Sequence, residues 1–146
     1  RMWSSNWRAY CNKLLNGSMI FEKEQDLVKE KAGISMYVNL VGGSFKKLSS
    51  QDVDYKLFDH NKNLCAYAEV KVIETKISDS FPLRLSARKV LKLIDKRLNP
   101  VIIWKCVDGI IYSNPQDITG EIIWSDKDLD LEVKYTNKKQ FRYVRA

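Results

Sequence analysis

Two carboxylates and a lysine in the middle of the chain have the types and spacing that phosphodiester chemistry requires. Asp54 is followed by Glu69 and Lys71 within one apolar stretch. Oxygen ligands from a few carboxylates suit Mg²⁺, which keeps several of its waters and binds phosphate oxygens. A metal held in this way can polarise a phosphodiester and activate a bound water. A neighbouring ammonium can stabilise the charge that develops during the reaction.

The elements that must position these groups are two strands of a predicted β-hairpin. Val53–Asp59 and Leu64–Glu74 are rich in β-branched, aromatic and leucine residues, and the polar residues between them are turn-prone. If the turn closes symmetrically, Asp54 lies directly opposite Glu69. Opposed carboxylates repel each other and call for a cation. Lys71 points to the same face as Glu69, because side chains alternate along a strand.

The spacing alone is short enough to recur by chance, and a solvated Asp54 beside a surface Glu69–Lys71 pair would explain it equally well. The hairpin context favours the site. The pattern then resembles the core of the PD-(D/E)XK, or restriction-endonuclease-like, nucleases, which include nuclease domains of type I restriction motor subunits and many phage nucleases. The residues that carry this resemblance are Asp54, Leu57-Phe58-Asp59, Asn61, Leu64, Ala66 and Glu69-Val70-Lys71.

This resemblance covers roughly residues 20–112, and Val53 stands where the family name has proline. It implies an α/β fold with a restriction-endonuclease-like αβββαβ core, in which helices flank a mixed central sheet. Asp54 and Glu69 match the family's metal ligands, with the Val70 carbonyl as a further ligand, and Lys71 matches its catalytic lysine. The implied cofactor is Mg²⁺, for which Mn²⁺ can substitute.

A third carboxylate, Glu24, is predicted on the helix that precedes the hairpin. Met19–Ala32 has helical spacing with Gly33 at its end, and Glu24 falls in the apolar stripe that contains Leu27 and Val28. An inward carboxylate is costly unless it is paired or bound to a cation. The family resemblance also implies a glutamate from this helix as a catalytic and metal-binding residue. A glutamate at the rim of the helix is the equally weighted alternative.

The net charge of +7 is unevenly distributed and predicts a polyanionic partner, nucleic acid before membrane. Four basic residues recur every four positions and are expected to form a ridge on a third helix. Helical charge runs are usually solvated, but this one has few acids with which to pair. The nucleic-acid-binding candidates are Arg84, Arg88, Lys92 and Lys96 of this ridge, with Lys89 beside it and Lys46 and Lys47 in a loop after Gly42-Gly43.

The chain of 146 residues is expected to form one nuclease-like domain. Its parts are an N-terminal helical extension (1–18), the core (20–113), and peripheral strands with a basic tail (114–146). Asp117 and Glu132-Val133-Lys134 repeat the first motif's spacing, but too little chain follows for a downstream helix and strand. The other expected elements are a strand over Ile34–Val41, a helix capped by Ser86 with Val90, Leu91, Ile94 and Leu98 inward, a hairpin turning at Asp108-Gly109, and strands over Glu121–Trp124 and Leu129–Tyr135.

Other features exclude alternatives. No long apolar run predicts a membrane span, and three scattered cysteines favour free thiols over disulfides or zinc. The single histidine, His60, falls in the hairpin turn. The expected setting is cytoplasmic or nucleoid-associated.

The leading interpretation is a Mg²⁺-dependent DNA endonuclease, with the N-terminal helix as the surface of a homodimer. The first alternative is a non-catalytic nucleic-acid-binding or structural module that keeps the nuclease fold. The second is an RNA-binding protein that stacks bases on Trp104, Trp124 and Tyr112, although these aromatic residues in predicted strands are more typical of a core.

Overall fold

The computed structural model describes residues 18–49, 52–118, 120–124, 129–133 and 141–146. Its main feature is a six-stranded sheet in the order β1-β2-β3-β5-β6-β9. The only parallel neighbours among these strands are β3 and β5, so the sheet is mixed, as expected. The strands are β1 (Ser44–Lys47), β2 (Tyr55–Phe58), β3 (Leu64–Val72), β5 (Pro100–Cys106), β6 (Gly109–Ser113) and β9 (Arg142–Arg145).

A smaller three-stranded sheet has the order β4-β8-β7. Its strands are β4 (Leu83–Ser86), β8 (Leu129–Val133) and β7 (Glu121–Trp124), and two short 3₁₀ helices, η1 (Ile77–Asp79) and η2 (Pro115–Asp117), complete the described elements. The predicted peripheral strands β7 and β8 are thus present. The end of the predicted basic tail forms a strand of the main sheet, because β9 pairs with β6.

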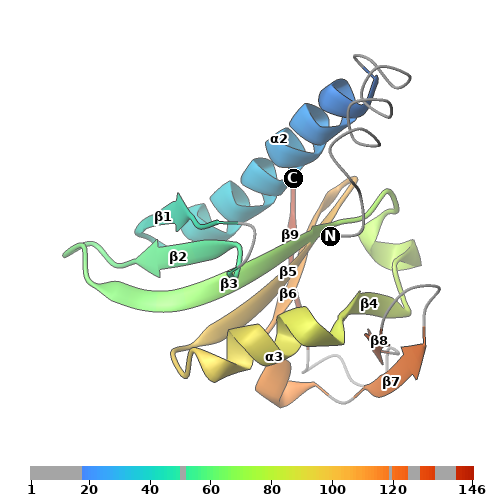
Figure 1. Ribbon diagram of the computed structural model, residues 1–146. Coiled ribbons are helices and arrows are strands. Elements are labelled where there is room, and N and C mark those ends of the chain that lie inside the picture. The colour runs from blue at the N-terminus through green and yellow to red at the C-terminus, as the bar shows by residue number, and fades with distance from the viewer. Residues whose placement is uncertain (1–17, 50–51, 119, 125–128, 134–140) are drawn as a thin grey trace, which may run out of the picture.

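Two helices cover opposite faces of the main sheet (Figure 1). Side chains that alternate along β5 divide between two cores. Ile102, Trp104 and Cys106 pack with Val90 and Leu93 of α3 (Ala87–Asp95), whereas Val101 and Ile103 pack with Ile34 and Val38 of α2 (Ser18–Val41).

Helix α2 corrects the predicted end of a helix at Ala32 and the predicted strand over Ile34–Val41. The helix continues through Gly33 to Val41. A Cβ at Gly33 would lie 3.1 Å from the Cβ of Lys105 and 3.4 Å from Cγ1 of Val70. Gly33 therefore lies where the helix packs closely on β3 and β5, and its lack of a side chain allows this packing instead of ending the helix.

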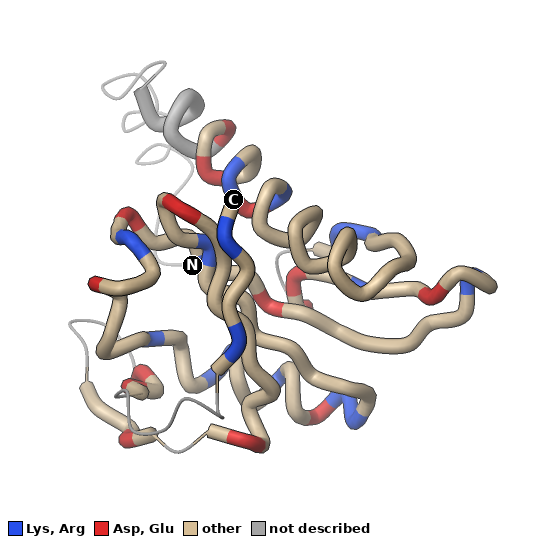
Figure 2. The backbone as a smooth tube through the Cα atoms, turned by 180° about the vertical axis from the view of Figure 1, so that it is seen from behind, with Lys and Arg blue, Asp and Glu red and all other residues tan. Residues whose placement is uncertain are grey.

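The inward face of α2 also differs from the predicted stripe. Val28 is 68% exposed and Glu24 is exposed, while Ile34 and Val38 are buried. The charged residues of α2 lie at or before Lys31, and the segment from Ala32 to Val41 carries none (Figure 2). The part that packs on the sheet is thus this uncharged C-terminal segment.

Helix α3 begins after Ser86, as predicted, but its inward face is shifted. Leu93 is fully buried, whereas Leu91, which was expected to face inward, is 67% exposed. Position 93 lies about 300° around a helix from Val90, and position 91 only about 100°, so Leu93 returns nearer to the buried side. Arg84 precedes the helix and belongs to strand β4, so the predicted four-residue ridge is not continuous.

Both predicted hairpins form. Strands β5 and β6 pair around Asp108-Gly109, and the fully buried run Val101–Trp104 lies between β3 and β6. Trp104 is core, as expected, and its Nε1 donates to the Arg84 carbonyl at 3.0 Å. Trp124 departs from the expectation, because it is 79% exposed on β7.

Cys65 and Cys106 are free thiols. The predicted N-terminal helix lies outside the described residues. Among the helices that the structure describes, none combines the length and apolarity that crossing a membrane would require.

Candidate active site

Asp54 and Glu69 face each other at the start of β2. The pairing of Tyr55 with Ala68 puts Asp54 opposite Glu69, which is the register that the hairpin pattern predicts. A bulge between Leu57 and Phe58 shifts the register only at the turn end of the hairpin. The predicted proximity of the two carboxylates is therefore confirmed.

Each of the two carboxylates accepts a hydrogen bond from a backbone amide of the opposite chain segment. The Asp54 amide donates to Oε1 of Glu69 at 3.1 Å, and the Val70 amide donates to Oδ2 of Asp54 at 2.9 Å. A residue in an extended strand directs its N–H and C=O to the same side, so the Val70 carbonyl also points towards Asp54. The side chains and the carbonyl that the sequence pattern indicates thus converge at one edge of β3.

Glu69 is a deeply buried carboxylate with a free oxygen. Its side chain is 1% exposed, and Oε2 has no hydrogen-bond partner. Burial, reinforced by the adjacent charge of Asp54, raises the pKa of Glu69 to about 8. A buried, unpartnered carboxylate oxygen is costly unless a proton or a cation occupies it.

Two lysines line a cleft next to strand β3. Lys71 lines a cleft of about 340 Å³ together with Lys89 of α3 and Glu30 of α2. The Lys89 ammonium lies 3.8 Å from Oε2 of Glu69, which is an ion-pair distance but too long for a hydrogen bond. The Lys89 ammonium is therefore the cation that the structure places beside Oε2 of Glu69, and Lys71 lines the same cleft as Lys89.

A second ion-pair network lies on the Asp54 side. The Lys47 ammonium is 2.6 Å from Oε1 of Glu30 and 3.4 Å from Oδ1 of Asp54. It also lies 4.8 Å from the centre of the Tyr55 ring. Burial, together with a hydrogen bond to Glu30, raises the pKa of the Tyr55 hydroxyl, so Tyr55 stays neutral.

The helix carboxylate at this site is Glu30, which the sequence pattern does not indicate. Glu24 is exposed and does not line the cleft. A helix predicted to continue through Gly33 would have indicated Glu30. Glu30, Ile34 and Val38 are four residues apart and therefore lie on the same face of such a helix.

The predicted nucleic-acid-binding residues divide into two groups. Arg84 binds Glu132 at 2.9 Å, Lys96 binds Asp52 at 2.7 Å, and Lys47 binds Glu30. The side chains of Arg88, Lys89 and Lys92 on α3 and of Lys46 on β1 are exposed, and Lys89 also lies 3.8 Å from Oε2 of Glu69. Of the second copy of the motif, Lys134 lies outside the described residues; among those described, Glu132 forms an ion pair with Arg84, and Asp117 lies in η2.

The donor set suits a hard divalent ion held by few protein ligands. Within the described residues, no three His, Cys, Asp or Glu side chains are grouped closely enough to hold a metal ion. Mg²⁺ is usually bound by one or two carboxylates and keeps several waters, so Asp54, Glu69 and the Val70 carbonyl fit it. The free Oε2 of Glu69 is the observation that supports this fit.

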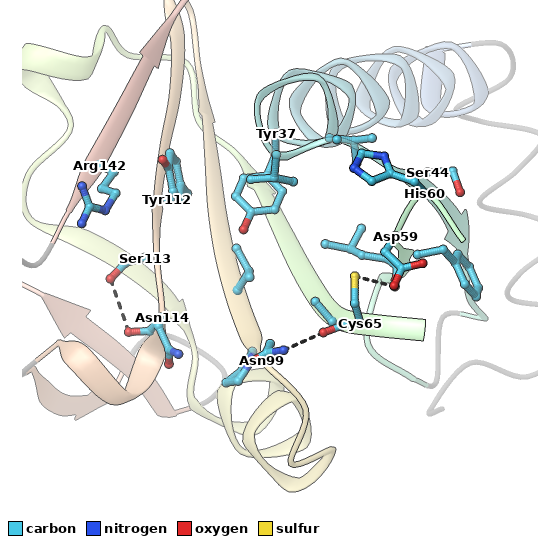
Figure 3. A pocket seen from close by; sticks show the side chains of 18 of the residues that line it. Tyr37, Ser44, Asp59, His60, Cys65, Asn99, Tyr112, Ser113, Asn114 and Arg142 are labelled. Carbon is cyan, nitrogen blue, oxygen red and sulfur yellow. Dashed lines mark hydrogen bonds between the residues drawn. The ribbon is translucent and has the colours of Figure 1, made fainter. Parts of the chain in front are cut away.

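A larger hollow of about 510 Å³ lies at the far end of β3, away from this pair (Figure 3). Its polar groups largely serve the fold. Oδ1 of Asp59 accepts from two turn amides, the Asn99 amide donates to the Cys65 carbonyl, and Tyr37 packs edge-on against Tyr112. Size therefore does not identify the candidate active site, and the unpartnered Glu69 oxygen does.

Comparison with family models, with curated proteins and with solved structures finds no match to the chain.

Proposed function

We propose that this protein is a Mg²⁺-dependent DNA endonuclease with a restriction-endonuclease-like core. The observation that carries the proposal is the free, buried Oε2 of Glu69 beside Asp54, with Lys71 two residues along the same strand. The element order supports it as well. Leaving aside β4, the chain runs α2, β1, β2, β3, α3, β5, which is an αβββαβ order with β3 parallel to β5.

In this proposal Asp54, Glu69 and the Val70 carbonyl would hold the ion. When bound there, Mg²⁺ would supply Lewis-acid activation of the phosphodiester and of the attacking water. The Lys71 ammonium positions the attacking water and stabilises the charge on the phosphate oxygens. Water adds to phosphorus and gives up a proton to the solvent, the P–O bond to the leaving sugar oxygen breaks, and that oxygen takes up a proton from the solvent. Arg88 and Lys92 on α3 contact the DNA backbone.

A non-catalytic DNA-binding module is the second candidate. The ion pairs of Lys47 with Asp54 and of Lys89 with Glu69 favour it, because they partly neutralise the carboxylates without any metal. The free oxygen of Glu69 favours the enzyme, because these pairs leave it without a hydrogen bond.

Cleavage of supercoiled plasmid DNA in Mg²⁺ and in EDTA distinguishes the two candidates. The wild type should nick or linearise the plasmid only with Mg²⁺. Lys71→Ala should lower the rate at least about 100-fold, as loss of one transition-state donor does, and should retain DNA binding in a gel-shift assay. Lys31→Ala, an exposed lysine on α2, is the matched control and should cleave normally. DNA binding by the wild type without any Mg²⁺-dependent cleavage would favour the binding module.

A further inference from the structure

Lys47 is the last residue of β1, and its ammonium lies between carboxylates from two other elements. Glu30 comes from α2 and Asp54 from the start of β2, with Nζ–O distances of 2.6 and 3.4 Å. The Tyr55 ring is 4.8 Å away. Without this ammonium, Glu30 would approach an acidic pair that already contains Glu69.

The Lys47 side chain is 41% exposed, whereas the Glu30 and Asp54 side chains are 17% and 12% exposed. The ammonium is thus partly open to water, and both carboxylates that it contacts are more buried than it is. Lys47 therefore places a positive charge between a carboxylate of α2 and the carboxylate that precedes β2.

The two carboxylates of the proposed metal site differ in what remains open to an ion. Asp54 uses Oδ2 for the Val70 amide and Oδ1 for Lys47, whereas Oε2 of Glu69 accepts no hydrogen bond and has only the longer, 3.8 Å ion pair with Lys89. In enzymes that use two metal ions, the ions lie about 3.5–4 Å apart and share a carboxylate. Lys47 occupies the side of Asp54 on which a second, shared ion would bind.

We propose that the Lys47 ammonium takes the place of a second divalent cation, so that the site binds a single ion on the Glu69 side and Glu30 is kept from coordinating metal. This inference rests on the proposed function, because it presupposes that Asp54 and Glu69 bind an ion. Lys47 is then a positioning residue that sets the number of ions.

Isothermal titration calorimetry with Mn²⁺ alone, in the absence of DNA, tests the inference. The wild type should bind one ion. Lys47→Met keeps the length of the side chain but removes its charge, so that a second ion should take the place of the ammonium between Glu30 and Asp54. Lys46→Met is the matched control, since the adjacent lysine points to the other face of β1 and makes the same change in net charge. It should still bind one ion.

Two further variants keep the test decisive. Lys47→Gln retains a hydrogen-bond donor for Glu30 without the charge, and it should also bind two ions. The double variant Lys47→Met/Glu30→Gln removes the ligand for the second ion and should return to one. Circular dichroism spectra establish that each variant is folded.

The possible failures are distinguishable. One ion in the wild type and still one in both neutral Lys47 variants would overturn the role of Lys47 and leave the proposed function intact. Two ions in the wild type would do the same. A wild type that binds no ion and cleaves no DNA would overturn the proposed function, and this inference with it.

Discussion

Glu69 is the residue at which the structural and chemical arguments meet. Burial makes the ionised form of the Glu69 side chain unfavourable. The hydrogen bond from the Asp54 amide to Glu69, and the one from the Val70 amide to Asp54, hold the two side chains in place. A carboxylate held in this way resembles those tuned for function, which are often buried beside a like charge. The metal-free protein therefore carries an energetic cost at this position that a bound cation would relieve.

The raised pKa of Glu69 predicts a pH-dependent stability in EDTA. Glu69 keeps its proton up to about pH 8 in the folded protein, because burial raises its pKa, whereas an unperturbed glutamate releases its proton near 4.5. Between these values the folded state binds more protons than the unfolded state, so stability falls as pH rises. Glu69→Gln should remove this contribution and be the more stable protein at pH 8, by at least about 1 kcal/mol.

Thermal unfolding of both proteins at pH 5 and pH 8 measures this difference. Asp79→Asn, an exposed carboxylate in η1, is the control and should show little change between the two pH values relative to the wild type. A gap between wild type and Glu69→Gln that is the same at both pH values would contradict the raised pKa. The Mn²⁺ affinity of the wild type should rise over the same range, because binding displaces the proton.

At the scale of elements, the site depends on how closely α2 approaches the sheet. Gly33 allows this approach, and Glu30 lies less than one turn before it on the same helix. The bulge at Leu57 and Phe58 confines the change of register to the turn end of the hairpin, so the register at Asp54 is unaffected. Helix α2 and the β2–β3 hairpin are therefore the elements that determine the geometry of the site.

Replacing Gly33 should displace α2. Gly33→Leu inserts a side chain where even a Cβ would lie 3.1 Å from Lys105, and overpacking of this kind typically costs about 1–3 kcal/mol. Ala32→Leu is the control, because Ala32 is exposed on the same helix. Urea unfolding should show a clearly lower midpoint for Gly33→Leu than for Ala32→Leu. Equal midpoints would mean that the helix does not pack closely at Gly33.

The sequence predicts the hairpin well because its register depends on local counting. The turn residues are polar, and side chains alternate between the two faces of each strand. Counting back from the turn therefore places Asp54 opposite Glu69. Helix α2 was harder to predict, since Gly33 resembles a stop signal and only its contact with β3 and β5 explains a glycine inside a helix. Glu30 and Lys47 meet only after that packing, so spacing alone could not pair them.

At the scale of the whole molecule, the charge distribution is more balanced than the sequence suggests. Arg84 and Lys96 are paired with carboxylates from distant segments, which the periodicity of the helix could not reveal. The net charge of +7 remains, and exposed basic side chains of α3 lie on the same helix as Lys89, which lines the cleft. The DNA-binding surface that we propose therefore includes fewer basic residues than the ridge predicted from the sequence.

This distribution predicts different effects for two charge reversals. Arg88→Glu on α3 should weaken DNA binding and reduce the slope of log affinity against log salt by about 1, since one phosphate contact is lost. Lys31→Glu changes the net charge equally from an exposed position on α2 and should have a smaller effect. Fluorescence anisotropy across a salt series provides both slopes. Equal losses for the two variants would indicate that net charge, rather than α3, determines binding.

The most direct test of the central claim is the position of Mn²⁺ in a crystal of the protein grown or soaked with that ion, located from its anomalous scattering. The account predicts one strong peak within bonding distance of the Glu69 carboxylate and of Asp54, and no peak beside Lys47. Crystals soaked in Mn²⁺ that show no peak at this pair, with Oε2 of Glu69 still unbound, would contradict it.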